Sequence, residues 1–186
     1  VLSAEGLLFI SPTTRQTLQV CTEQAKSGEL VEFIKRVREG EKRGLRAVSL
    51  MLVFCSSGER VRSVAEKLAQ VQLSSIQLHA GVPQARRERS LSDFHLEGKR
   101  ILIATDDAEA AGICTKHVRY LINYDFPASL KLYCSRLARL SREPATAHAF
   151  FTQASASLAK EFAALLEQSE ESVDPALKAL ASKDSK

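Results

Sequence analysis

The sequence predicts an α/β fold built on an open, parallel sheet with helices on both faces. Residues 47–55 form a near-continuous apolar run, which suits a strand that is buried on both sides. Residues 29–39 carry apolar side chains at the i, i+3, i+4 and i+7 spacing of an amphipathic helix. Strand and helix patterns alternate five or six times with short connections, which favours right-handed βαβ units.

Six segments have the length and composition of strands. Residues 100–105, like 47–55, are nearly all apolar, as expected inside a parallel sheet. The apolar run at 118–124 stops at Asp125-Phe126-Pro127, which is typical of a turn. The expected strands are, in chain order, 17–21, 47–55, 74–79, 100–105, 118–124 and 147–152.

Helices are expected between these strands. A helix follows Ser57 and Gly58, and the helix at 83–96 has its proline near the start, where a missing N–H costs little. A short helix follows Pro127, and apolar residues recur at helical spacing within 155–168. The end of the chain, 175–186, has the composition of a frayed turn and a polar tail. The expected organisation is a linker remnant or flexible segment at 1–16, one domain at 17–180 and a tail at 181–186.

The composition excludes several classes of protein. A length of 186 residues suits one domain with a real core, and the net charge of +4 permits a polyanionic partner without requiring one. The four cysteines form no C-x-x-C pair, which favours a reduced, intracellular protein. The sequence does not distinguish between nucleus, cytoplasm and organelle. No apolar run approaches membrane-spanning length, and no signal peptide is visible. Because the first residue is Val1, we expect a fragment of a longer chain.

Two basic clusters are candidate contacts for anions. Arg136, Arg139 and Arg142 follow a predicted strand at a spacing of three, and ligands of open α/β sheets bind near the carboxyl ends of strands. Guanidinium groups grip phosphate oxygens bidentately, although a solvated basic face is the alternative on spacing alone. The basic run at 35–46 is compatible either with a solubilising face or with a nucleic-acid contact.

Five segments, in order, resemble the motifs of a known family. They read LVFCSS from Leu52, HAGVPQARR from His79, ILIATDDAEAAGI from Ile101, INYDFP from Ile122 and YCSRLARLSR from Tyr133. Each alone is a weak match, but their order and intervals resemble the second, C-terminal RecA-like domain of a DEAD-box RNA helicase. The resemblance covers roughly residues 17–180 and implies a RecA-like open parallel sheet.

The sequence also departs from the family pattern. Motif VI has Ser135 in place of the usual His and Ala138 in place of the usual Gly. Motif V is one residue longer, lacks its usual Arg at Ala111, and has Cys114 where the family places an Asp that binds the ribose of ATP. The resemblance therefore implies a divergent member with weakened recognition of the nucleotide sugar.

The resemblance implies that Arg139 and Arg142 are catalytic arginine fingers for ATP hydrolysis. Gly112 and Cys114 would join the three arginines at the cofactor site, although the resemblance assigns Arg136 to structural or interdomain contacts in preference. ATP and Mg²⁺ would be shared with an N-terminal RecA-like domain of the same protein, because this sequence contains no phosphate-binding loop and no D-E-A-D string. The isolated domain should therefore be inactive, and no metal ligand is expected within it.

RNA would cross the same sheet edge, where side chains and backbone N–H groups meet the sugar–phosphate backbone without reading sequence. For Thr105 and Asp106, the alternative to RNA contact is a helix cap. Phe54 is expected to pack near the arginines, and the alternative for this residue is a purely structural place in the core. The residues assigned to RNA are Ser56, Ser57, Gly81, Gln84, Arg87, Thr105 and Asp106.

The leading interpretation is the C-terminal half of an ATP-dependent RNA helicase. Its partners would be RNA, the N-terminal RecA-like domain and regulatory proteins, with no membrane contact and a monomeric isolated domain. A hydrolysis-deficient helicase-like module that binds RNA or proteins is the alternative, favoured by the changes in motif V. An unrelated doubly wound enzyme is disfavoured, because no Gly-rich dinucleotide fingerprint or nucleophile elbow is present.

Overall fold

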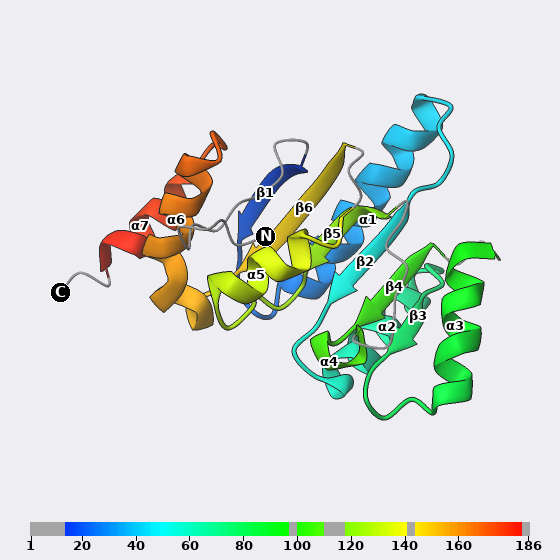
Figure 1. Ribbon diagram of the computed structural model, residues 1–186. Helices are drawn as coiled ribbons and strands as arrows, with labels where there is room; N and C mark the ends of the chain where they lie inside the picture. The colour runs from blue at the N-terminus through cyan, green and yellow to red at the C-terminus, as the bar shows by residue number, and fades with distance from the viewer. Residues whose placement is uncertain (1–13, 97–99, 110–117, 141–143, 184–186) are drawn as a thin grey trace.

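The predicted parallel sheet is confirmed in a computed structural model of the chain. The structure describes residues 14–96, 100–109, 118–140 and 144–183. Within these ranges one six-stranded sheet has the order β1-β6-β5-β2-β4-β3, and every neighbouring pair is parallel (Figure 1). The strands are β1 (Thr14–Val20), β2 (Leu50–Phe54), β3 (Ile76–Leu78), β4 (Ile101–Ala104), β5 (Val118–Asn123) and β6 (Ala145–Phe151).

Helices cover both faces of this sheet. One apolar cluster joins the inner sides of α1 and α2 to alternate strand residues such as Met51 and Val53. The other joins α3, α5, α6 and α7 to residues of the opposite parity, including Leu52 and Phe54. Every residue of β2 is buried, which explains its continuous apolar run. The helices are α1 (Lys26–Arg43), α2 (Gly58–Gln70), α3 (Gln84–Leu96), α4 (Asp106–Glu109), α5 (Leu130–Leu137), η1 (Gln153–Leu158), α6 (Ala159–Gln168) and α7 (Pro175–Lys183).

The end of the chain is more ordered than the sequence predicts. Residues 175–183 form the regular helix α7 instead of a frayed turn, because Leu177 is fully buried in the core beside α6. Asp174 accepts a hydrogen bond from the backbone N–H of Ala176, and Pro175 occupies the first helical position. The Asp-Pro pair was therefore a readable start signal for the helix.

His148 on β6 is a buried histidine that should make stability depend on pH. It is 5 % exposed, its Nδ1 lies 2.8 Å from the Thr17 hydroxyl, and its ring stacks on Phe33. Burial, with a smaller contribution from Arg36, lowers the pKa of His148 to about 4. The unfolded chain therefore takes up this proton near pH 6.5 while the native protein does not.

Stability should fall by about 2 to 3 kcal/mol between pH 7 and pH 4.5, because the unfolded state binds the proton more tightly there. Urea unfolding at a series of pH values measures this loss. His148→Gln should make the dependence much shallower. A slope that survives in His148→Gln would show that other groups cause it.

Candidate functional site

The carboxyl ends of β2, β3, β4 and β5 meet at one edge of the sheet, as the parallel topology requires (Figure 1). Ser56 follows β2, the loop beginning at His79 follows β3, Thr105 follows β4, and Asp125 follows β5. The last turn of α5 is joined to this edge through Arg136. The motif segments that lie far apart in the sequence thus form one candidate site.

Arg136 ties two of these strand ends, those of β4 and β5, together by hydrogen bonds. Its Nε and Nη2 donate to the two carboxylate oxygens of Asp106 at 2.8 and 2.7 Å. Its Nη1 donates to Asn123 Oδ1 at 2.6 Å and to the backbone carbonyl of Asp125 at 3.1 Å. The Arg136 side chain is 3 % exposed, so its bidentate pair with Asp106 is shielded from water on the arginine side. The geometry gives Arg136 a structural role, and its contact with a cofactor stays a prediction.

Phe54 and Thr105 complete the surroundings of this arginine. The Arg136 guanidinium lies 4.6 Å from the centre of the Phe54 ring, and Phe54 is fully buried, so this residue packs near Arg136 and is also part of the core. Thr105 directly precedes α4, yet its buried hydroxyl has no hydrogen-bond partner among the described residues, so the alternative of a helix cap by this side chain is not supported. Asp106 orients Arg136, and its contact with RNA stays a prediction.

Asp125 is the centre of a polar network that the sequence analysis missed. Its carboxylate lies 2.5 Å from Lys26 Nζ and accepts bonds from both the N–H and the hydroxyl of Ser56 at 2.9 Å. Arg60 approaches the same carboxylate at 3.5 Å and also pairs with Glu23. Burial works against the charge on Asp125, but the bonds from Lys26 and Ser56 outweigh it and lower the pKa of this carboxyl. The network fixes the loop after β2 to the starts of α1 and α2.

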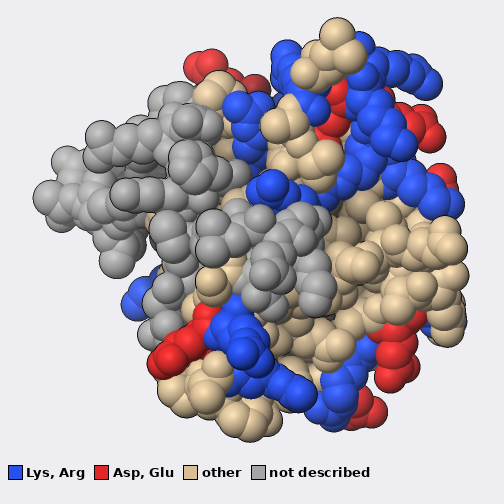
Figure 2. Space-filling view, turned by 90° about the vertical axis from the view of Figure 1, so that its right-hand side faces the viewer, with Lys and Arg blue, Asp and Glu red and all other residues tan. Residues whose placement is uncertain are grey.

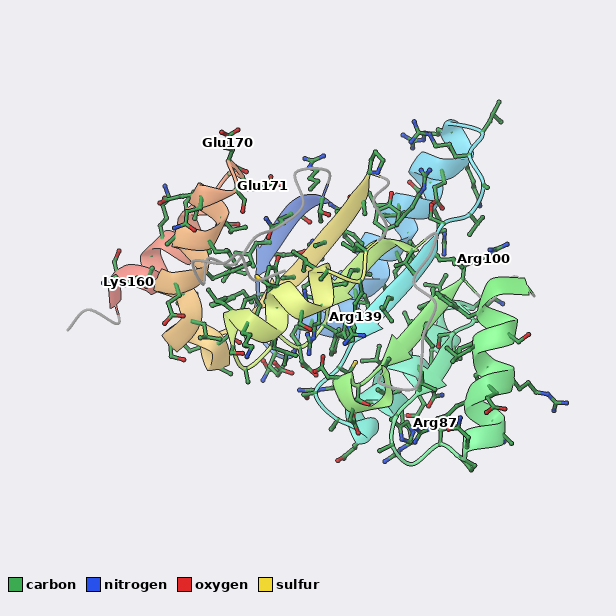
Figure 3. All side chains as sticks on the ribbon, viewed as in Figure 1. Arg87, Arg100, Arg139, Lys160, Glu170 and Glu171 are labelled. Atoms are coloured by element: carbon green, nitrogen blue, oxygen red, sulfur yellow. The ribbon has the colours of Figure 1, made fainter. Side chains whose placement is uncertain are left out.

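The loop after β3 is held by its own arginine and histidine. Arg87 donates through Nε to the carbonyl of Val82 and through Nη2 to that of Ala80, both at 2.7 Å (Figure 3). His79 accepts a bond from the N–H of Gly81 at 3.2 Å. A Cβ atom on Gly81 would lie 3.1 Å from the His79 ring, so a side chain there would crowd it. Arg87 therefore shapes the loop in addition to any contact with a ligand.

The remaining site residues lie around this edge. Ser57 caps α2 by accepting a bond from the N–H of Arg60, and the exposed Gln84 bonds Glu88 one turn along α3. Arg139 is partly exposed and follows the last residue of α5, with its N–H bonded to the carbonyl of Arg136 (Figure 3). Three predicted residues lie outside the described part of the chain: Gly112, Cys114 and Arg142.

The fold and this edge define a class of protein, the second RecA-like domain of a helicase. Residues 29–143 match the family described as "Helicase conserved C-terminal domain". The chain is 33 % identical over 165 residues to DEAD-box ATP-dependent RNA helicase 20 of Arabidopsis thaliana, a match that covers 88 % of this chain and 31 % of that protein. It is 28 % identical to the human probable ATP-dependent RNA helicase DDX17, covering 87 % of this chain and 22 % of that protein.

Solved structures agree on the fold. The C-terminal domain of the DEAD-box protein Dbp5 superposes with a TM-score of 0.67 at 22 % identity, covering 84 % of this chain and 86 % of that one. E. coli SrmB, in its complex with the regulator of ribonuclease activity A, gives a TM-score of 0.70 at 21 % identity, covering 88 % and 93 % of the two chains.

The chain belongs to the helicase conserved C-terminal domain family, and its sequence is similar to part of DEAD-box ATP-dependent RNA helicases. It spans about a third of the length of the first curated relatives it matches. Among the described residues, no helix is long and apolar enough to cross a membrane.

Proposed function

We propose that this domain supplies arginine fingers for ATP hydrolysis and half of an RNA backbone-binding surface in a two-domain RNA helicase. The observation that carries the proposal is the locked Arg136. Four hydrogen bonds within the domain fix this residue at the strand ends, so the chain just beyond α5 starts from a defined position. Arg139, three residues further along, then extends from a rigid base, as catalytic groups require.

The chemistry of the domain fits the phosphates of ATP better than the metal that accompanies them. Arg139 and Arg142 would stabilise negative charge on the transferred phosphoryl group, and this does not require them to bind Mg²⁺. In the ranges that the structure describes, no group of three or more His, Cys, Asp or Glu side chains could hold a metal ion. We assign the Mg²⁺ ligands and the phosphate-binding loop to the N-terminal domain of the longer protein.

The isolated chain should show no ATPase activity above background, with or without RNA. It contains neither a phosphate-binding loop nor the D-E-A-D carboxylates that would hold Mg²⁺. A phosphate-release assay on the purified chain measures this, with Arg139→Ala as the control for contaminating enzymes. Turnover that disappears in Arg139→Ala would mean that the chain carries a complete site.

RNA binding by the isolated chain should be weak, independent of sequence and sensitive to salt, because few phosphate contacts are available. Arg87→Ala should lower the affinity for all sequences alike and make the salt dependence shallower, since it removes a cation and loosens the loop at 79–83. Fluorescence anisotropy with two unrelated single-stranded RNAs measures both effects. Arg62→Ala, on the exposed side of α2, is the matched control. A loss confined to one RNA would contradict binding through the backbone.

The second candidate, a module without hydrolysis, is favoured by the motif V changes at Ala111 and Cys114. It retains RNA or protein binding but predicts that the full-length protein does not hydrolyse ATP. RNA-stimulated ATPase activity of the full-length protein separates the two functions directly. Activity that depends on Arg139 supports the enzyme, and inactivity with retained RNA binding supports the module.

A further inference from the structure

A basic pocket lies at the edge of the sheet opposite the candidate site. It has a volume of about 430 Å³ and is formed by the last turns of α1 together with the starts of β2 and β5. Exposed Arg36, Arg46 and Arg119 line it, with the half-buried ring of Tyr120. Because β2 and β5 run from this pocket to Ser56 and Asp125, the full length of the strands separates it from the motif residues.

The positive charge of the molecule is concentrated beside this pocket. Residues 35–46 contain six basic and two acidic side chains, an excess of four that equals the net charge of the whole chain. One of the acids, Glu41, is 6 % exposed and already bound by Arg38 at 2.9 Å and by the N–H of Ser49 at 3.0 Å. Figure 2, in which the end of α1 lies at the top, shows Lys and Arg side chains gathered there. The pocket is thus suited to an anionic ligand.

Exposed apolar side chains adjoin the same pocket. Leu45 is 96 % exposed and Val48 is 49 % exposed, and these are two of the three large apolar residues that are exposed in the described ranges. The turn that presents Leu45 is held by hydrogen bonds from Gly44 to Gly40 and from Arg46 to Glu41. Leu45 itself has a φ of +50°, which a bulky residue rarely adopts. The loop therefore holds a leucine out into solvent in a defined conformation.

We propose that this surface, defined by Arg36, Arg46, Arg119, Leu45 and Val48, is a docking site for a protein partner through an acidic segment that carries a large apolar side chain. Carboxylates of the segment enter the arginine-lined pocket, and its apolar side chain packs on Leu45 and Val48. Arginine beside apolar groups is typical of protein interfaces, whereas aliphatic side chains offer little to an RNA backbone. Because the surface lies away from the motif edge, the partner and RNA can bind together.

The test measures binding of the 186-residue chain to three labelled probes by fluorescence anisotropy. The probes are a dodecapeptide of Asp and Glu with two leucines, the same peptide with serines in place of the leucines, and an oligouridylate. The main variant is Arg36→Glu with Arg46→Glu. Its charge-matched control is Arg62→Glu with Lys67→Glu on α2, and melting curves confirm that each variant folds. Leu45→Asn removes the apolar group while keeping a residue that tolerates positive φ.

The double variant at the pocket should weaken binding of the leucine peptide about tenfold or more relative to the control pair. Leu45→Asn should weaken the leucine peptide severalfold and leave the serine peptide unchanged, while RNA affinity should be equal in the two charge-reversed pairs. The proposal is overturned if the leucine peptide shows no saturable binding, or if the pocket variant and the control bind it alike. It is also overturned if the pocket variant loses RNA binding and keeps peptide binding, which would make the surface a second RNA contact.

Discussion

Under the proposed function, replacing Arg139 by Ala in the full-length protein should lower RNA-stimulated kcat about a hundredfold or more while RNA binding is largely kept. An arginine finger stabilises charge that develops only in the transition state, and comparable fingers are worth about 10³–10⁵ in rate. Arg142→Ala should behave in the same way. Arg139→Lys should rescue poorly, because an ammonium offers one point charge in place of a planar fork. Steady-state ATPase kinetics with saturating RNA measures the effect.

The stability of the alanine variants distinguishes an arginine finger from an arginine that supports the fold. Arg139 follows the end of α5 and is partly exposed, so its truncation should cost far less stability than truncation of the buried Arg136. Thermal melting of each variant is the control. Normal kcat in both Arg139→Ala and Arg142→Ala would rule out the finger assignment, and a large drop in melting temperature would assign these residues to the fold.

The second large effect is expected at Arg136. Arg136→Ala should destabilise the domain by about 3 kcal/mol and lower its melting temperature by roughly 10 °C. The truncation removes the bidentate partner of Asp106, leaves the fully buried Asn123 without its donor, and takes the cation from the face of Phe54. Urea unfolding of the isolated chain measures the change in free energy.

Arg86→Ala is the matched control for this variant, because Arg86 is an exposed arginine on α3. Its substitution should change stability by less than about 0.5 kcal/mol. If Arg136→Ala were equally mild, the hydrogen bonds to Asp106 and Asn123 would contribute little, and the rigid base proposed for Arg139 would lose its support.

Arg136 and Arg139 belong to an equally spaced series in the sequence but lie in different environments in the fold. Arg136, Arg139 and Arg142 recur every three residues, a spacing that would place them on one surface if the helix continued through all three. However, α5 ends at Leu137, so Arg136 lies on the buried side of the helix while Arg139 lies beyond it. The difference depends on where the helix ends, which spacing alone does not determine.

Long apolar runs were the most reliable guide to the fold. The strand expected at 47–55 contains β2, and that at 100–105 contains β4, because a strand buried on both faces needs a continuous apolar sequence. Helix ends were less predictable. α1 begins at Lys26, earlier than expected, since a buried ion pair to Asp125 fixes a polar first turn.

The Asp125 network could not be predicted from local pattern. Its partners Lys26 and Ser56 lie 99 and 69 residues away in the chain, so only the folded topology brings them together. The one available signal was a carboxylate directly after a buried strand, at the edge where polar loops converge. The motif residues could be placed at this edge because each follows a strand.

Reconstitution of ATPase activity from separate domains tests the central claim most directly. The segment that precedes this chain in the longer protein is mixed with the chain in the presence of single-stranded RNA, and phosphate release is measured. We expect turnover only when both parts are present, rising with the concentration of this chain and lost with Arg139→Ala. Activity of the preceding segment that is unchanged by this chain, or complementation that survives in both Arg139→Ala and Arg142→Ala, would contradict the claim that this domain completes the ATP site.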